Sequence, residues 1–387
     1  MISTLYRGSV KDLLGPIKAK GVSAIIFEYT DAYSVFDWGR MPDELDRKGE
    51  ALATLAAALF DKVESAETWR TFSRSPGAAA LRSGNPMGAD FDQLGEELQR
   101  SGLRTHYLGL LGGRHESYRE NYEPVSLKQL QAPSHHLVVR QVSVVKPTLN
   151  SVDGKVVPDY SETVASPPPR LVPLEVIFRF SCPPGSSLPE RDSTIKTGQK
   201  WDFPYMELFT KLEPSDRHLE TEEALAISGL SDVQLHKILI RTAWLAGWLK
   251  NICSKAGLEL ADGKLEWGVG EDGEVFLVDA IGPDELRILR DEVQLSKEFL
   301  RIHYRKTAWF ADLKRAKAEA ADQGIADWKE LVEEDVPPLP VELRELAIQM
   351  YLALANELSG RRWFEAWSLD KVVAGIRRLS ARRGNGE

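Results

Sequence analysis

The sequence predicts an α+β protein that begins with an antiparallel sheet. Residues 1–40 consist of short apolar stretches broken by polar turns, and SAIIFEYT (residues 23–30) is a β-branched and aromatic run typical of a buried strand. Leucine and valine recur at helical spacing from Gly49 to Val63, which predicts one helix covering that sheet. A longer apolar pattern at residues 233–256 predicts a second, mostly buried helix that ends at Gly257.

The N-terminal part of this fold is predicted to span residues 1–146. Its strands are expected to resume at THYLGLLG (105–112) and HHLVVRQVSVV (135–145), after an exposed insertion at about 73–100. The stretch from Ser73 to Asn85 is polar and contains glycine and serine, which is typical of such an insertion.

Three further parts follow. Residues 147–170 have few large apolar side chains and end in three prolines, which predicts a linker or flap. LVPLEVIFRF then starts a strand at the head of a C-terminal domain, 171–301. Charged helical sequence, broken at VPPLP (336–340), fills a C-terminal extension, 302–387, whose basic end is expected to be a solvated tail.

Composition argues against several classes of protein. The chain has 387 residues, of which 43% are hydrophobic and 28% charged, so we expect a soluble protein with one large core or two. No stretch of about 18 apolar residues occurs, and residues 1–20 lack the order of a signal peptide, so we expect a cytoplasmic protein with no membrane partner. Two cysteines give no disulfide framework. The net charge of −9 argues against nucleic-acid binding.

An acidic hairpin is predicted at GKLEWGVGEDGEVFLVDAIGPDELR (263–287). Asp272-Gly273 is a strong signal for a two-residue type I′ turn, and with that turn Glu266 lies directly opposite Asp279. Lys264 and Glu266 then share one face of the first strand, while its apolar residues face the core. Two like charges in opposed positions are destabilising unless a cation lies between them or one carboxylate is protonated.

Magnesium is one cation that suits this hairpin, because it favours one or two carboxylates together with waters and phosphates. The alternative is an edge hairpin whose acids are solvated, with Lys264 as their local counter-ion. Six of the seven histidines, in contrast, show no metal-binding spacing such as His-x-x-x-His and are expected to be structural. They are His106, His135, His136, His218, His236 and His303.

Eight short motifs occur in the order found in one enzyme family. They are LYRGSVK, FEYTDAYSVFD, DRKGE, THYLG, LVVRQV, PLEVIFR, AGLELADGKLEWGV with GEVFLVDAIGPDELR, and SKEFLR. Together, from about Leu5 to Arg301, they resemble the SAICAR synthetase (phosphoribosylaminoimidazole-succinocarboxamide synthase) family. The resemblance implies a nucleotide-binding N-terminal sheet domain and a larger α/β C-terminal domain that binds substrate and metal, with an ATP cleft between them.

The resemblance also implies an activity and its cofactors. ATP and Mg²⁺ would activate a substrate carboxylate as an acyl phosphate, and an amine would then displace phosphate to form an amide. The partners implied are small molecules, a phosphoribosyl-imidazole acid and an amino acid, and a homo-oligomer is possible. The catalytic residues implied are Lys11, Lys264, Glu266 and Asp279.

Binding roles follow from the same match. Glu266 and Asp279 would hold the metal and Lys11 would lie near the ATP phosphates. The segment along the adenine comprises Val138, Val139, Arg140 and Val142. The substrate-binding residues implied are Asp37, Lys48, Arg179, Ser186, Asp262, Lys264, Arg287 and Arg301.

The chain departs from the family pattern in four places that concern the substrate. Ser9 replaces a lysine, Ala280 replaces a glutamate after the metal aspartate, and RFSCPPGSS (179–187) contains two prolines that stiffen a substrate loop. Around Asp216, SDRHLE replaces the family's His-Asp-Pro. Two alternatives to SAICAR synthesis therefore stay open. One is a diverged ligase that amidates a related nucleotide or nucleoside acid, and the other is a nucleotide-binding relative without catalysis.

Overall fold

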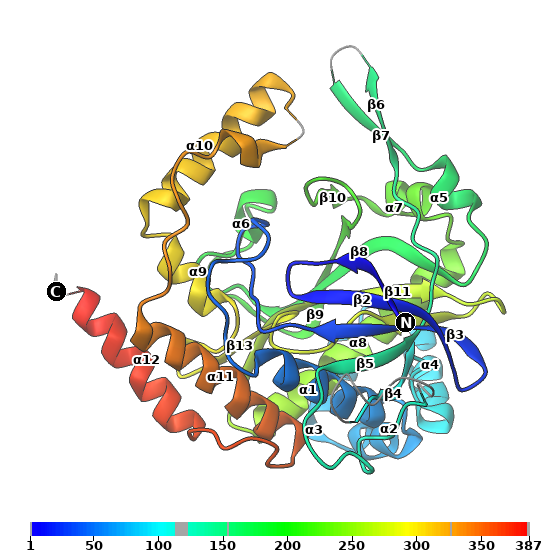
Figure 1. Cartoon of the computed structure of the whole chain (residues 1–387). Coiled ribbons are helices and arrows are strands. Elements are labelled where there is room, and N and C mark those ends of the chain that lie inside the picture. Colours follow the sequence, from blue (N-terminus) through cyan, green and yellow to red (C-terminus); the bar gives the residue numbers. More distant parts are fainter. Residues whose placement is uncertain (1, 113–122, 153–154, 326, 385–387) are drawn as a thin grey trace.

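Two antiparallel sheets with helices packed around them form the structure (Figure 1). This computed structural model describes residues 2–112, 123–152, 155–325 and 327–384. The first sheet has the strand order β1-β2-β3-β5-β4, and the second has the order β10-β9-β8-β11-β13-β14 with β12 paired to β11. This mixture of antiparallel sheets and helices confirms the α+β prediction.

The strands of the first sheet are β1 (Ser3–Arg7), β2 (Lys11–Ala19), β3 (Val22–Tyr29), β4 (Tyr107–Leu110) and β5 (His136–Arg140). Those of the second are β8 (Arg170–Ser181), β9 (Lys200–Thr210), β10 (His218–Leu219), β11 (Glu259–Val269), β12 (Val275–Val278), β13 (Leu286–Arg290) and β14 (Val293–Gln294). Between the sheets in sequence, β6 (Thr148–Val152) and β7 (Lys155–Asp159) form a hairpin that projects from the body of the molecule in Figure 1. Short helices α5 (Ser161–Ala165), α6 (Leu188–Arg191) and α7 (Thr221–Ser228) occupy the connections.

Helix α1 (Lys48–Val63) packs against β3, β4 and β5, as the leucine spacing predicted. Phe60 of this helix stacks on Tyr107 of β4, with ring centroids 5.5 Å apart. The helix start is held by Asp31, whose carboxylate accepts hydrogen bonds from the backbone of Arg47 (3.1 Å) and Gly49 (2.9 Å). The first backbone N–H groups of a helix have no acceptor within the helix, and the Asp31 carboxylate provides one.

The exposed insertion predicted at Ser73 to Asn85 is instead part of a helical layer. This helical layer consists of α2 (Ala66–Ser73), α3 (Pro76–Ser83) and α4 (Ala89–Ser101). The polar sequence SPG is a helix start, because the Ser75 hydroxyl accepts from the Ala78 backbone N–H and Pro76 takes the first helical position. Ala78 and Leu81 are buried, and α3 packs against the long helix α8.

Helix α8 (Asp232–Lys255) is the second predicted helix and the centre of the main core. Ser231 and Gln234 close its N-terminus with a reciprocal capping box. Trp244 of α8 stacks on Phe91 of α4 with ring centroids 4.7 Å apart. A Cβ on Gly95 would lie 2.3 Å from the Trp244 ring, so this close approach requires glycine.

The C-terminal region is helical and breaks at residues 336–340, as predicted. It contains α9 (Glu298–Tyr304), α10 (Ala308–Gln323), a 3₁₀ turn η2 (Trp328–Leu331), α11 (Val341–Ser359) and α12 (Leu369–Gly384). Helix α11 packs against α1, and the Lys62 ammonium donates to the last carbonyls of α11, those of Leu358 and Ser359. One apolar cluster therefore joins side chains from residues 25 to 379. The predicted division into four parts stays a prediction.

The register predicted for the acidic hairpin is wrong by one residue. Glu266 of β11 lies opposite Val278, because the connection is a five-residue loop, 270–274. Of the predicted turn pair, only Gly273 has a positive φ (75°), while the Asp272 carboxylate accepts from the Glu274 backbone N–H and pairs with Arg104. Aspartate closes turns through its side chain in this way, without adopting the left-handed conformation.

Among the described residues, no helix is both long enough and apolar enough to cross a membrane.

Candidate functional site

Two adjoining cavities form a single cleft with two lobes. One cavity, of about 660 Å³, is lined mostly by charged side chains, and we term it the charged lobe. The other, of about 590 Å³, is lined mostly by apolar side chains, and we term it the apolar lobe. The residues shared by both linings, which we term the junction, are Tyr6, Lys11, Lys211, Glu266 and Asp279. The two acids of the predicted metal site thus lie where the lobes meet.

Each junction acid is placed by its strand. Glu266 reaches the cleft because Leu265 and Trp267, its neighbours on β11, point into the core on the other face. Asp279 follows the end of β12 with φ 65°, and its carbonyl oxygen accepts a hydrogen bond of 2.9 Å from His106 Nε2. Burial lowers the pKa of His106 to about 4, so the ring is neutral and acts as a structural donor, as predicted for this histidine.

The acid directly opposite Glu266 is Glu175 of β8, which sequence reasoning did not identify. Two lysines separate these carboxylates. Lys211 Nζ lies 2.5 Å from Glu266 and 3.7 Å from Glu175, and Lys264 Nζ lies 2.5 Å from Glu175 and 3.4 Å from Glu266. Opposed acids need a compensating cation, and here the protein supplies two.

The two junction acids have pKa values shifted in opposite directions. Burial raises the pKa of Glu266, and the charge of Asp279 raises it further. Burial acts on Asp279 in the same sense, but the ammonium groups of Lys11, Lys211 and Lys264 outweigh it and hold the pKa below its ordinary value. Lys11 also forms an ion pair with Asp279. Asp279 is therefore ionised at neutral pH, and a further cation would favour the ionised form of Glu266.

The donor set at the junction fits Mg²⁺. Carboxylate oxygens of Glu266 and Asp279 face one space, and Asp284 and Glu285 line the charged lobe beside them. Hard oxygen donors of this kind are the ligands Mg²⁺ selects. Glu285 also provides a carboxyl group close to the position where Ala280 lacks one; its pKa rises to about 7 through burial and the charges of Asp279 and Asp284.

Of the four residues predicted to lie along the adenine, one lines the apolar lobe, and this is Val142. Val138 packs in a small cluster on the other face of the sheet, and Val139 is buried in the main core. Arg140 lines a separate cavity beside Arg104. The lobe is instead walled by side chains of both sheets, among them Leu13, Ile25, Phe27, Leu171 and Val278.

In the charged lobe, the predicted residues Asp37, Lys264 and Arg301 are brought together. Arg301 Nε is buried and has no hydrogen-bond partner in the part of the chain that the structure describes, so it can donate to a ligand. Ser9 lines the same lobe, and other cations surround it where the family has lysine. They are Arg7, Arg40, Lys297 and Lys329. Lys329 belongs to η2, so the C-terminal region contributes to this wall.

Lys48 is placed behind the charged lobe. Its side chain is fully buried, and its ammonium donates to Asp284 (2.9 Å) and to the Ala32 carbonyl (3.3 Å). Because Asp284 itself lines the lobe, Lys48 can position that acid and does not face the cavity.

Four further residues predicted to bind substrate are not among the described residues that line either lobe. Arg179 is buried between Glu207 (2.7 Å) and Asp262 (3.1 Å), and Arg287 lies 3.4 Å from Asp262. The Ser186 hydroxyl accepts from the Leu188 backbone, within the Pro-Pro loop. Burial raises the pKa of Asp262, and Arg287 and Arg179 oppose this shift. Glu298, the ion-pair partner of Arg301, raises the pKa further.

Comparison with known proteins shows what this chain resembles. The model of the family described as SAICAR synthetase matches residues 4–316. A protein of Archaeoglobus fulgidus, provisionally named a phosphoribosylaminoimidazole-succinocarboxamide synthase, is 34% identical over 96% of this chain and 99% of its own length. The synthase of that name from Thermoplasma volcanium is 23% identical over 93% of this chain and 99% of its own length.

A solved structure shares the fold. The SAICAR synthase from Saccharomyces cerevisiae, determined in complex with SAICAR, superposes with a TM-score of 0.56 at 20% identity, covering 94% of this chain and 96% of the yeast chain. The family resemblance inferred from the sequence motifs is confirmed.

Proposed function

The chain belongs to the SAICAR synthetase family, and we propose that it is an ATP- and Mg²⁺-dependent ligase that joins carboxyaminoimidazole ribotide to L-aspartate. The observation that carries this proposal is the two-lobed cleft whose lobes share Glu266 and Asp279. A phosphoryl group that moves between two substrates must pass a point that both substrates reach, and the junction is such a point.

ATP is assigned to the apolar lobe. A flat, apolar base suits walls made by Phe27, Leu171 and Val142, and its phosphates would extend toward Lys11 at the junction. Bound Mg²⁺, held by Glu266 and Asp279, supplies positive charge that stabilises the transferring phosphoryl group. Lys11, Lys211 and Lys264 hold further positive charge at the same place.

The acid substrate is assigned to the charged lobe. Its carboxylate oxygen attacks the γ-phosphorus, the bond to ADP breaks, and an acyl phosphate forms. The aspartate amine then attacks the acyl carbon, phosphate leaves, and the amine loses a proton to give the amide. Arg301 and Lys297 present cations to the anionic substrate, and Arg301 has an unused donor for it.

The test is an assay of ADP release with ATP, Mg²⁺, the ribotide and aspartate, in which each component is omitted in turn. The proposal expects release only when the ribotide is present. ADP release that never depends on the ribotide would contradict it.

A diverged ligase is the second candidate, and Arg179 favours it. Its guanidinium is already neutralised by Glu207 and Asp262, where the family match assigns it to the substrate phosphate. The same assay with other imidazole or nucleoside acids in place of the ribotide separates the two candidates, because only one acid will support efficient ADP release. A relative without catalysis would release no ADP with any acid.

A further inference from the structure

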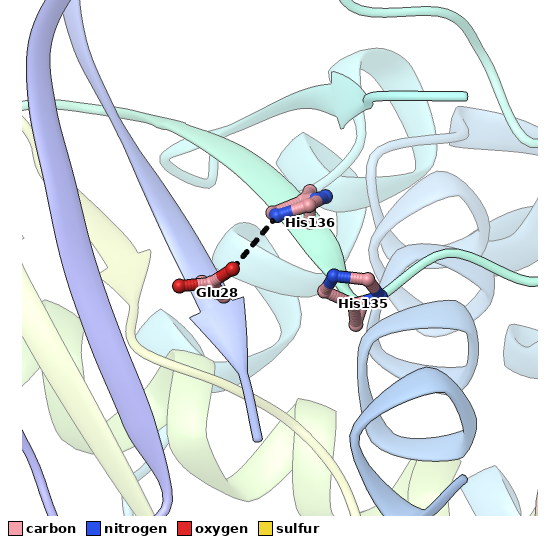
Figure 2. A group of neighbouring side chains, drawn as sticks. All are labelled: Glu28, His135 and His136. Atoms are coloured by element: carbon pink, nitrogen blue, oxygen red, sulfur yellow. Dashed lines mark hydrogen bonds and ion pairs between the residues drawn. The ribbon is translucent and has the colours of Figure 1, made fainter. Parts of the chain in front are cut away.

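A second group of metal-ligand side chains lies on the face of the first sheet that points away from the cleft. It consists of Glu28, His135 and His136 (Figure 2). Phe27 of β3 faces the apolar lobe, and neighbouring residues of a strand point to opposite faces, so Glu28 faces the other side. Val138 of β5, two residues after His136, packs on that same outer face with Ile26.

The backbone places these three side chains next to one another. Glu28 and His136 are direct cross-strand partners of β3 and β5, and His136 Nε2 lies 3.2 Å from Glu28 Oε1. His135 precedes β5 at a bend, and this brings its ring to 4.0 Å from the His136 ring, centroid to centroid. One ligand atom from each of the three lies within 4.8 Å of the others (Figure 2).

The arrangement is fixed by main-chain hydrogen bonds. The His135 carbonyl accepts from the Tyr29 backbone (2.8 Å), and the His136 carbonyl accepts from the Leu111 backbone (3.1 Å). The His136 N–H donates to the Ser134 hydroxyl (3.1 Å). His136 is buried and the other two are half-buried, so the packing around them holds the three side chains in place.

The geometry points to a binding site for a divalent transition metal on the outer face of the first sheet, formed by Glu28, His135 and His136. Two imidazoles and one carboxylate form a ligand set suited to Zn²⁺, with water in the fourth position, and poorly suited to Mg²⁺. A bound ion would tie the end of β3 to the start of β5 and so stabilise the sheet from behind. This site is independent of the proposed ligase activity.

The alternative is that Glu28 and His136 form a hydrogen bond and no metal binds. A metal site needs all three side chains as ligands. Substitution of His135 therefore distinguishes the two readings.

The experiment titrates chelator-treated protein with Co²⁺ and Zn²⁺ in excess Mg²⁺, which occupies the carboxylates of the cleft. We expect one Co²⁺ per chain with the visible absorption of a four-coordinate site, displacement by Zn²⁺, and a rise in melting temperature. Glu28→Gln and His135→Gln should each weaken Co²⁺ binding by more than about 100-fold, because each removes a ligand.

His236→Gln is the matched control. His236 also pairs with a carboxylate, that of Asp90 (3.3 Å), but on the exposed surface. Neither residue belongs to the one group of potential metal ligands found among the described residues. Its substitution should leave the titration unchanged. Wild-type protein that gives no such absorption, or that binds Co²⁺ as tightly after His135→Gln, would overturn the proposal, whichever result the ligase assay gives.

Discussion

The apolar and charged lobes meet at the same acids but are built in different ways. Strands of both sheets line the apolar lobe, and their side chains make most of its wall apolar. The charged lobe adds loops, α9 and η2 to strand residues such as Lys264 of β11, and its lining holds more cations than acids. A base needs shape, which a sheet provides, whereas an anionic substrate needs placed charges, which loops and helix ends can supply. The junction is where both requirements apply.

The largest expected effect is at the junction. Asp279→Asn or Glu266→Gln should lower turnover at least about 1000-fold, because the charge stabilisation supplied by a bound metal is worth several kcal/mol. Steady-state ADP release measures the loss, and circular dichroism checks that the fold survives. Glu271→Gln, an exposed acid on the loop of the same hairpin, is the control and should retain full activity. Near-normal turnover in Asp279→Asn would remove the metal site from the mechanism.

The pH dependence of stability should distinguish the charged lobe from the apolar one. Burial and the charges of Asp279 and Asp284 raise the pKa of Glu285 from its ordinary value of about 4.5 to about 7, so the folded protein binds this proton more tightly than the unfolded chain does. The free energy of unfolding should therefore fall as pH rises from about 4.5 through 7, by up to a few kcal/mol. Glu285→Gln should lack this decline.

Denaturant melts of wild type and Glu285→Gln across that range measure the effect. The difference between the two proteins should be small at the acid end and should grow in favour of the variant up to neutral pH. A difference that is constant with pH would mean that Glu285 titrates normally.

The contribution of the C-terminal region to the charged lobe can be tested at Lys329. Lys329→Ala should raise the KM for the acid substrate about 10-fold, on the scale of one charge-assisted contact, and leave the KM for ATP unchanged. Lys314→Ala, an exposed lysine of α10 that is absent from the lobe lining, is the matched control. An equal rise in the KM for ATP would show that the lobes are not occupied as assigned.

The smallest expected effect is in the apolar lobe, where structure and family resemblance make different predictions. Val142→Ala should raise the KM for ATP a few-fold, since about two CH₂ equivalents of apolar contact are lost. Arg140→Ala should leave it unchanged, because its side chain lines another cavity. If Arg140→Ala weakens ATP binding more than Val142→Ala does, the adenine base of ATP does not lie in the apolar lobe.

Local sequence patterns predicted the long elements well. Helices α1 and α8 were predicted from apolar spacing, and the acidic hairpin was predicted from alternation and an Asp-Gly turn. The register failed because Asp272 closes the loop with its side chain, a choice that local propensity does not determine. Helix α3 was missed because its Ser-Pro-Gly start resembles a loop.

The site was predicted less completely, for reasons of topology. Glu175 reaches Glu266 from the neighbouring strand β8, and Lys211 reaches it from beyond the end of β9; sequence alone does not give the strand order that places them there. His135 and His136 were expected to be structural because they show no metal-binding spacing such as His-x-x-x-His. The bend before β5 brings the two adjacent rings together, and Glu28 is distant in sequence. In each case the pairing of strands brings together side chains that are far apart in the sequence.

The central claim is that the γ-phosphoryl group passes to the acid substrate at the junction. The most direct test follows a carboxylate oxygen of that substrate into the released phosphate. The acid substrate is labelled with oxygen-18 in its carboxylate, and the phosphate released during turnover is analysed by mass spectrometry. If the γ-phosphoryl group passes at the junction to that carboxylate, each released phosphate carries one labelled oxygen. Turnover that yields unlabelled phosphate would contradict the account.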